Sequence, residues 1–247
     1  MHNHKKLIPI FIILSILCGW TCGRRSEPAN EAERFDRIAR KLFKSEVYPG
    51  LARQITEDYG VTRGLCVDVG CGPAYLVIEL AKLTDLSIIG VDIDSDAVAI
   101  GQRNVRMAGM QGRVAVEWGD VHRLRFRDGE ADLIVSRGSF LFWKDRVLAF
   151  QEIHRVLKPG GVAFVGGGMG RFLTTEKKQE IRKELDRMNV KRPAVTRFEV
   201  EEALALAGVT QYRIFGDGSE DTGCKCGMWV EMRKSNSNGK QKLHGVK

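Results

Sequence analysis

The chain has 247 residues, of which 43% are hydrophobic and 28% are charged, and this composition is typical of one globular domain with a full core. Its formal net charge is +8, but nine of the positive charges lie in residues 1–25 and 233–247, which contain no acidic residues. Residues 26–232 therefore carry a net charge of −1. A nearly neutral domain excludes a broad phosphate-binding surface, so we expect no nucleic-acid partner.

Residues 1–25 are interpreted as an N-terminal signal or membrane-anchor segment. A short basic stretch precedes an apolar run of 12 residues, Leu7–Cys18, and the apolar character continues to Cys22. This length is typical of a signal peptide and short for a membrane span, which needs about 20 residues. No small-x-small cleavage site or lipoprotein box is visible. We expect membrane association through residues 7–22, with an export signal, a lipoprotein anchor or a misassigned start codon as alternatives.

Residues 26–46 are predicted to form a polar linker and a cap helix. Apolar residues at helical spacing within Glu31–Glu57 predict two helices, broken at Tyr48-Pro49-Gly50. We expect these helices to cover a ligand cleft.

A glycine-containing turn follows the first predicted strand. Leu65–Val69 reads as a buried parallel strand, and Gly70 and Gly72 allow a sharp turn where a side chain would collide with a ligand. The helix that follows has free N–H groups and a positive dipole end, which favour polar or anionic ligand atoms. Asp92 lies 20 residues beyond Gly72, at the distance where a second strand delivers a carboxylate to ribose hydroxyls. The sequence therefore predicts a nucleotide site, although Tyr75 stands where a nicotinamide-type fingerprint has its third glycine.

Short apolar strands alternate with helical segments from residue 65 onward. The strands are expected near 65–69, 87–92, 113–118, 131–136 and 161–167, and the helices near 74–83, 95–108 and 143–157. Such alternation predicts a parallel sheet with helices on both faces. The last third is predicted to contain helices at 174–188 and 199–207, an antiparallel pair at 212–215 and 228–232, and a disordered basic tail at 235–247.

Three further motifs follow the glycine turn in order: Glu117–Val121, Ala131–Gly138 and Glu152–Gly161. With them, residues 47–234 resemble a class I S-adenosylmethionine-dependent methyltransferase domain, in particular the small-molecule type of methyltransferase domains 11 and 25. The resemblance implies an α/β fold with a Rossmann-like, doubly wound, mostly parallel seven-stranded sheet, a C-terminal antiparallel hairpin and helices on both faces. It also implies S-adenosyl-L-methionine as the cofactor and methyl transfer to an unidentified, small-molecule acceptor.

The resemblance further implies a set of cofactor-binding residues. The residues expected to line the methionine part are Asp68, Gly70, Cys71, Gly72 and the backbone of Ser136 and Arg137. The residues expected at the nucleoside are Asp92 on the ribose, Ile93 against the adenine, Asp120 at the adenine amino group and the Val121 backbone at a ring nitrogen. Many family members have a third glycine where this chain has Ala74, and we expect the small alanine to change little.

The segment after the fourth predicted strand holds the candidates for the acceptor site. Arg137, Phe140 and Trp143 are expected to contact the acceptor, since ligands gather at the carboxyl ends of parallel strands. The alternatives are a core position for the two aromatic residues and an ion pair between Arg137 and Asp145. No catalytic residue is predicted, because a sulfonium is already a good leaving group and positioning can supply most of the acceleration.

Two other functions stay open at this point. A nicotinamide-dependent oxidoreductase would share Asp92, but Tyr75 and Gly119-Asp120-Val121 argue against it. A membrane-tethered thiol or metal-binding module would use Cys224 and Cys226, but no His or Cys pair stands near them in sequence, so we expect no metal site. Because a methyltransferase needs cytosolic S-adenosylmethionine, we expect a membrane-associated protein whose catalytic domain is cytoplasmic.

Overall fold

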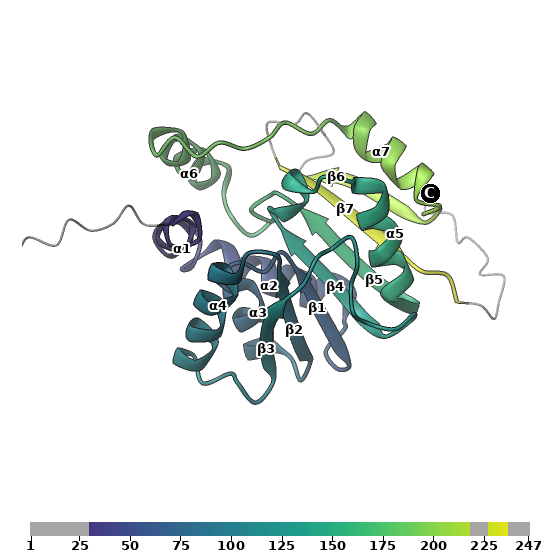
Figure 1. Ribbon diagram of the computed structural model, residues 1–247. Helices are drawn as coiled ribbons and strands as arrows, with labels where there is room; N and C mark the ends of the chain where they lie inside the picture. Colours follow the sequence, from purple (N-terminus) through teal and green to yellow (C-terminus); the bar gives the residue numbers. More distant parts are fainter. Residues whose placement is uncertain (1–29, 218–226, 237–247) are drawn as a thin grey trace, which may run out of the picture.

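A seven-stranded sheet forms the centre of the computed structural model, which describes residues 30–217 and 227–236. The strand order is β3-β2-β1-β4-β5-β7-β6 (Figure 1). Neighbouring strands from β3 to β5 are parallel, and β7 runs antiparallel to both β5 and β6. The strands are β1 (Leu65–Val69), β2 (Ser87–Asp92), β3 (Val114–Trp118), β4 (Ala131–Arg137), β5 (Leu157–Gly166), β6 (Tyr212–Gly216) and β7 (Met228–Arg233).

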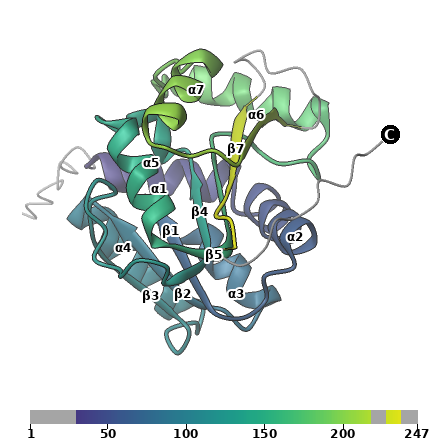
Figure 2. The same cartoon turned by 90° about the vertical axis from the view of Figure 1, so that its right-hand side faces the viewer.

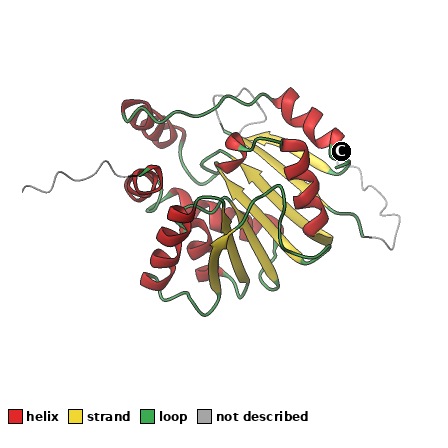
Figure 3. Ribbon diagram, viewed as in Figure 1, coloured by secondary structure: helices red, strands yellow, loops and turns green. Residues whose placement is uncertain are grey.

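Helices cover both faces of this sheet (Figure 3). Apolar side chains of α2, α3 and α4 pack in one buried cluster, and those of α5 and α7 pack in a second cluster on the opposite face. Figure 2 shows the central strands enclosed between these helices. The helices are α1 (Glu31–Leu42), α2 (Val47–Tyr59), α3 (Tyr75–Leu83), α4 (Ser95–Met107), α5 (Arg146–Val156), α6 (Thr175–Arg187) and α7 (Arg197–Leu206), with a 3₁₀ turn at Ser139–Phe142.

The order of the strands creates a switch point between β1 and β4. The chain moves outward from β1 through β2 to β3, and then returns to the other side of β1 to form β4. In sheets of this kind, ligands bind in the crevice outside the carboxyl ends of the two strands at the switch point. The sequence-based expectation of a Rossmann-like, mostly parallel seven-stranded sheet with a C-terminal antiparallel pair is confirmed.

The break expected at Tyr48-Pro49-Gly50 is wrong. All three residues lie in α2, which begins at Val47, and the interruption between α1 and α2 falls at residues 43–46. Pro49 is in the first turn of α2, where its missing N–H would have had no partner within the helix.

Two further boundaries also differ from the predictions. The helix expected from residue 143 begins at Arg146, because Asp145 caps it by accepting a hydrogen bond from the Leu148 N–H at 2.9 Å. The strand expected at 161–167 already begins at Leu157, which pairs with Ala131 of β4.

A buried carboxylate fastens α1 to the rest of the fold. Asp36 is only 4% exposed, and its oxygens accept hydrogen bonds from Tyr75 Oη at 2.9 Å and Arg40 at 2.5 Å. Arg103 and Asn104 of α4 donate to it from 3.3 Å each. Several donors offset the cost of burying a carboxylate, so Asp36 joins α1 to the start of α3 and to α4.

α1 also meets α6 (Figure 1). Lys41 Nζ lies 2.6 Å from Glu184 Oε1. Arg34 donates to the Met188 carbonyl at 2.9 Å and to the Asn189 carbonyl at 3.3 Å. These contacts join the first helix of the described chain to a segment 154 residues later.

Replacing Tyr75 with Phe should destabilise the fold by about 1–2 kcal/mol, because it removes a donor from the buried carboxylate of Asp36 and keeps the ring. Urea denaturation measures the free energy of unfolding. Tyr212→Phe is the matched control, since Tyr212 is exposed. Equal stability of the Tyr75→Phe and Tyr212→Phe proteins would contradict the role assigned to this hydrogen bond.

Candidate functional site

The turn between β1 and α3 folds back over the end of β2. The N–H groups of Gly70 and Cys71 both donate to the Val91 carbonyl, at 2.8 and 3.1 Å. Gly70 has φ +71°, and a Cβ at this position would lie 2.2 Å from the Cβ of Ser139. Glycine is therefore required at residue 70 both by the backbone conformation and by the close approach of the turn after β4.

Ala74, the departure from the family's glycine pattern, also has a left-handed backbone, with φ +63°. Its side chain is fully buried in the apolar cluster with α2 and α3. Ala74 therefore adopts a backbone conformation that glycine adopts more readily, and its methyl group packs in the core.

Asp92 lies at the carboxyl end of β2 and faces the glycine turn. Its Oδ2 accepts from the Gly72 N–H at 2.8 Å, and its Oδ1 accepts from the Asp94 N–H at 3.0 Å. Burial raises the pKa of Asp92 in spite of these hydrogen bonds. Because a carboxylate offers about four lone-pair positions, Asp92 can still accept hydrogen bonds from ligand hydroxyl groups.

Asp68 is a buried acid without a partner for one of its oxygens. The residue is 1% exposed, and its Oδ1 has no hydrogen-bond partner among the described residues. Burial raises the pKa of Asp68 to about 8, and the neighbouring charge of Asp92 contributes to the increase. An unpaired carboxyl group at the switch point of the sheet is suited to a cationic group of a ligand.

Asp120 is held by His122, two residues further along the chain. His122 Nδ1 lies 2.6 Å from Asp120 Oδ1, and the His122 N–H also donates to that oxygen at 3.0 Å. The Asp145 N–H donates to His122 Nε2 at 3.2 Å, so the proton of a neutral ring resides on Nδ1. Burial acts to raise the pKa of Asp120, but the hydrogen bonds from His122 lower it overall. The carboxylate is thereby kept ionised and oriented.

The expected adenine neighbours differ in exposure. Ile93 is 61% exposed although it is apolar, and Trp118 beside it is 61% exposed. Trp118 Nε1 donates to the Ile93 carbonyl at 2.9 Å, which links the ends of β2 and β3. Val121, in contrast, is buried in the core.

Two serines join the ends of β4 and β1. Ser136 is 1% exposed, and its Oγ lies 2.6 Å from Ser139 Oγ, which donates to the Val69 carbonyl at 2.9 Å. Because the Ser139 hydroxyl has one proton, Ser136 must be the donor of the shorter bond. Ser139 was not among the predicted residues; only its position two residues after β4 pointed to the ligand edge of the sheet.

The structure places Phe140 and Trp143 in the core, the alternative that the sequence left open. Phe140 is 1% and Trp143 8% exposed, and their rings meet edge to face with centroids 6.3 Å apart. Trp143 also packs on Phe150 of α5 at 5.8 Å. Phe142, between them, is the exposed aromatic residue of this turn.

The ion pair with Asp145, the alternative considered for Arg137, is not formed, and Asp145 caps α5. The guanidinium of Arg137 instead lies 4.0 Å from the ring centroid of Phe43, and its Nε donates to the Gly168 carbonyl at 3.2 Å. Arg137 therefore connects β4 to the segment between α1 and α2 and to the loop after β5.

Some predictions fall on residues outside the described ranges. These are the apolar segment 7–22, Cys224 and Cys226, and the tail from residue 237. Within the described ranges, no helix is long and apolar enough to cross a membrane. The same residues contain no group of three or more His, Cys, Asp or Glu side chains that could hold a metal ion.

Comparison with known proteins identifies the family. A protein from Methanococcus maripaludis, provisionally assigned as an S-adenosyl-L-methionine-dependent methyltransferase, has a crystal structure that superposes with a TM-score of 0.72. It is 33% identical in sequence, and the match covers 86% of this chain and 98% of that one. The chain belongs to the S-adenosylmethionine-dependent methyltransferases. A family model described as a methyltransferase domain matches residues 67–165.

Curated relatives of this methyltransferase match only in part. The sterol 24-C-methyltransferase of Aspergillus fumigatus is 29% identical over 47% of this chain and 32% of its own length. The demethylmenaquinone methyltransferase of Staphylococcus aureus is 27% identical over 54% of this chain and 55% of its own length. The chain thus spans about a third to just over half of these two relatives.

These findings confirm the family, fold and cofactor predicted from the sequence, and they support neither the nicotinamide-dependent oxidoreductase nor the thiol or metal-binding module. The residues present also fit S-adenosyl-L-methionine on structural grounds. The unpaired buried carboxyl of Asp68 suits its ammonium group, and the acid Asp92 beside the glycine turn suits its ribose.

The raised pKa of Asp68 should make the ligand-free protein less stable as the pH rises. Between pH 3.8 and about 8 the folded protein keeps a proton on Asp68 that the unfolded chain releases. Stability falls with pH wherever the folded state binds more protons, and the total effect is on the order of a few kcal/mol. Asp68→Asn should therefore gain stability relative to the parent protein as the pH increases from 5 to about 8.

Urea denaturation at several pH values measures this difference, with Asp85→Asn as the control on an exposed acid of 75% side-chain exposure. A stability difference between the parent protein and Asp68→Asn that does not change with pH would exclude a raised pKa at Asp68.

Proposed function

We propose that the protein transfers the sulfonium methyl group of S-adenosyl-L-methionine to a small-molecule acceptor. The observation that carries the proposal is a pair of acids on β1 and β2, the buried Asp68 with its unpaired oxygen and the half-buried Asp92 against the glycine turn. One suits an ammonium group and the other suits ribose hydroxyls, and S-adenosyl-L-methionine contains both.

In the proposed complex the nucleoside lies over the ends of β2 and β3. Asp92 accepts hydrogen bonds from the ribose hydroxyls, and the exposed side chain of Ile93 packs against the adenine. Asp120, oriented by His122, accepts from the adenine amino group. The backbone N–H of Val121 donates to a ring nitrogen.

The methionine part lies over the turn between β1 and α3. Gly70, Cys71 and Gly72 would present backbone to it, and Asp68 would neutralise the ammonium group, which would lie near the backbone of Ser136. The serine contacts that tie β4 to β1 hold both sides of this subsite in place.

The bound cofactor supplies a methyl group on a positively charged sulfur that leaves as a neutral thioether. The protein's contribution is to hold donor and acceptor at reactive distance and to exclude water, so no acid–base residue is required. α1, fastened by Asp36, is suited to cover the site at the carboxyl ends of the strands. Of the three residues expected to contact the acceptor, we propose only Arg137 for this role, because Phe140 and Trp143 are buried in the core.

S-adenosylhomocysteine, the product form of the cofactor, should bind to the purified protein, and NADH should not. Asp92→Asn should weaken this binding at least about tenfold, because a hydrogen bond to a charged acceptor contributes about 1.5–3 kcal/mol. Isothermal titration calorimetry gives both affinities, with Asp85→Asn as the control and thermal denaturation confirming that each variant is folded. Tighter binding of NADH than of S-adenosylhomocysteine would overturn the assignment.

We also propose that the apolar segment 7–22 attaches the protein to a membrane with the catalytic domain on the cytoplasmic side. The support is its composition together with the cofactor, which is made in the cytosol. A reporter that is active only outside the cytosol, fused after Lys247, should give no signal, and deletion of residues 1–25 should release the protein from the membrane fraction. Strong reporter activity would show export instead.

A further inference from the structure

Arg137 lies at the carboxyl end of β4, one residue after Ser136, and its charge has no acidic partner in the described structure. Its guanidinium lies over the rings of Phe43 and Tyr48, with centroid distances of 4.0 and 5.4 Å. One of its N–H groups donates to the Gly168 carbonyl. Within residues 30–217 and 227–236, no carboxylate lies within ion-pair distance of Arg137.

Such an environment positions a cation without neutralising it. The aromatic rings attract the guanidinium and hold its plane, and together with the hydrogen bond to Gly168 they offset part of the cost of its partial burial. A guanidinium has five N–H donors in a planar fork, which matches the two oxygens of a carboxylate. A half-buried arginine with most of its donors unused, at the ligand edge of the sheet, is suited to bind such a group.

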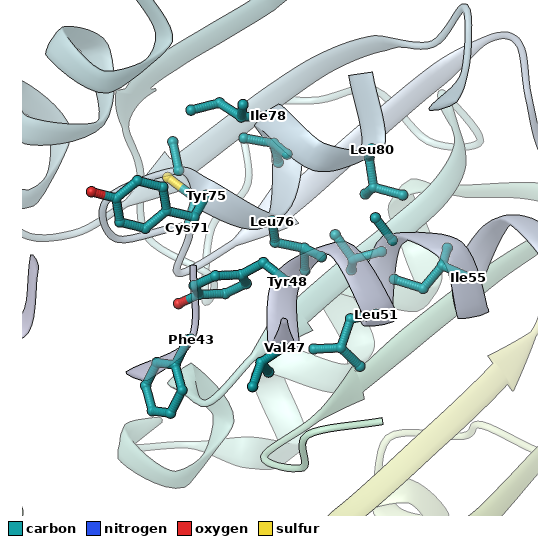
Figure 4. Packing of buried hydrophobic residues seen from close by; sticks show 14 of the residues in the cluster. Phe43, Val47, Tyr48, Leu51, Ile55, Cys71, Tyr75, Leu76, Ile78 and Leu80 are labelled. Atoms are coloured by element: carbon teal, nitrogen blue, oxygen red, sulfur yellow. The ribbon is translucent and has the colours of Figure 1, made fainter. Parts of the chain in front are cut away.

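Tyr48, whose ring lies under the Arg137 guanidinium, belongs to an aromatic cluster beside the end of β4. Its buried ring packs 6.0 Å from Phe43 and 5.8 Å from Tyr75, and the hydroxyl ends of both tyrosines lie on the same side of this apolar cluster (Figure 4). Burial raises the pKa of Tyr48, while Arg137 lowers it and Asp68 raises it further. Asp68, with its unpaired oxygen, pairs with Val135 across β1 and β4, and Arg137 ends β4. An acid and a cation without an acidic partner among the described residues therefore lie at the same edge of the sheet, and together they complement the ammonium and carboxylate of an amino acid.

We propose that Arg137 binds the carboxylate of a small molecule held in the cleft, opposite the subsite of Asp68. The proposal rests on the proposed function, which places a ligand there. Two sources of the carboxylate are compatible with this chemistry. It belongs either to the amino-acid end of the cofactor or to the methyl acceptor, and the experiment below distinguishes them.

The first arm compares two ligands that differ only in the carboxylate, S-adenosylhomocysteine and its decarboxylated analogue S-adenosyl-3-thiopropylamine. If the cofactor is the source, the parent protein should bind S-adenosylhomocysteine at least about tenfold more tightly than the analogue. Arg137→Gln should then remove this preference and leave the affinity for the analogue unchanged. The measurement on the parent protein does not depend on any variant being folded.

The second arm tests the acceptor as the source. If both ligands bind the parent protein equally, a metabolite extract separated by anion exchange is incubated with methyl-labelled S-adenosyl-L-methionine. Labelled products should then come from the anionic fractions, and Arg137→Gln should lose at least about nine-tenths of that labelling without a change in affinity for S-adenosylhomocysteine. Arg63→Gln, at a side chain 84% exposed, is the control.

Arg137→Lys keeps the positive charge but lacks the planar fork of N–H donors. It should therefore lose less of the ligand preference in the first arm, or less of the labelling in the second arm, than Arg137→Gln. The proposal is overturned if the parent protein does not distinguish the two ligands and Arg137→Gln labels the same products as the parent. A parent protein that binds neither ligand contradicts the proposed function itself, which is a different result.

Discussion

The site depends on how closely the turn after β1 approaches the turn after β4. A single added methyl group at Gly70 would overlap Ser139, so the two turns are in contact over glycine backbone. This contact allows Ser139 to hydrogen bond to the last carbonyl of β1 and to the Ser136 hydroxyl, so that the end of β4 is fixed beside the end of β1. The absence of a side chain at Gly70 therefore allows the ends of β1 and β4, which face the same ligand site, to lie close together.

Burial of acids is the second principle of the site. Asp68 is buried and Asp92 is half-buried, and no described lysine or arginine forms an ion pair with either of them. The ligand-free site is consequently unfavourable for negative charge, and a ligand that brings a positive charge and hydroxyl groups relieves that cost. Asp36 shows the contrasting arrangement, because its arginine, asparagine and tyrosine donors come from the protein itself.

Sequence periodicity was sufficient for the sheet, because each buried strand and its following helix is a local pattern. The glycine turn and Asp92 predicted the nucleotide site. The missed features are contacts between distant segments. Nothing near Tyr75 indicates that its hydroxyl meets Asp36, 39 residues earlier, or that Arg137 stacks on Phe43. Aromatic residues at a turn fit a pocket wall or a core equally well, and only packing placed Phe140 and Trp143 in the core.

The contacts between α1 and α6 also set a time at which the site can be completed. Arg34 finds its carbonyl partners at Met188 and Asn189, so the cover over the strand ends closes only after most of the domain has been synthesised. On a ribosome that adds about 5–20 residues per second, the glycine turn and Asp92 emerge several seconds before this partner does. The nascent chain thus passes through a stage in which α1 can already join α3 and α4 through Asp36, while its partners in and after α6 have not yet been made.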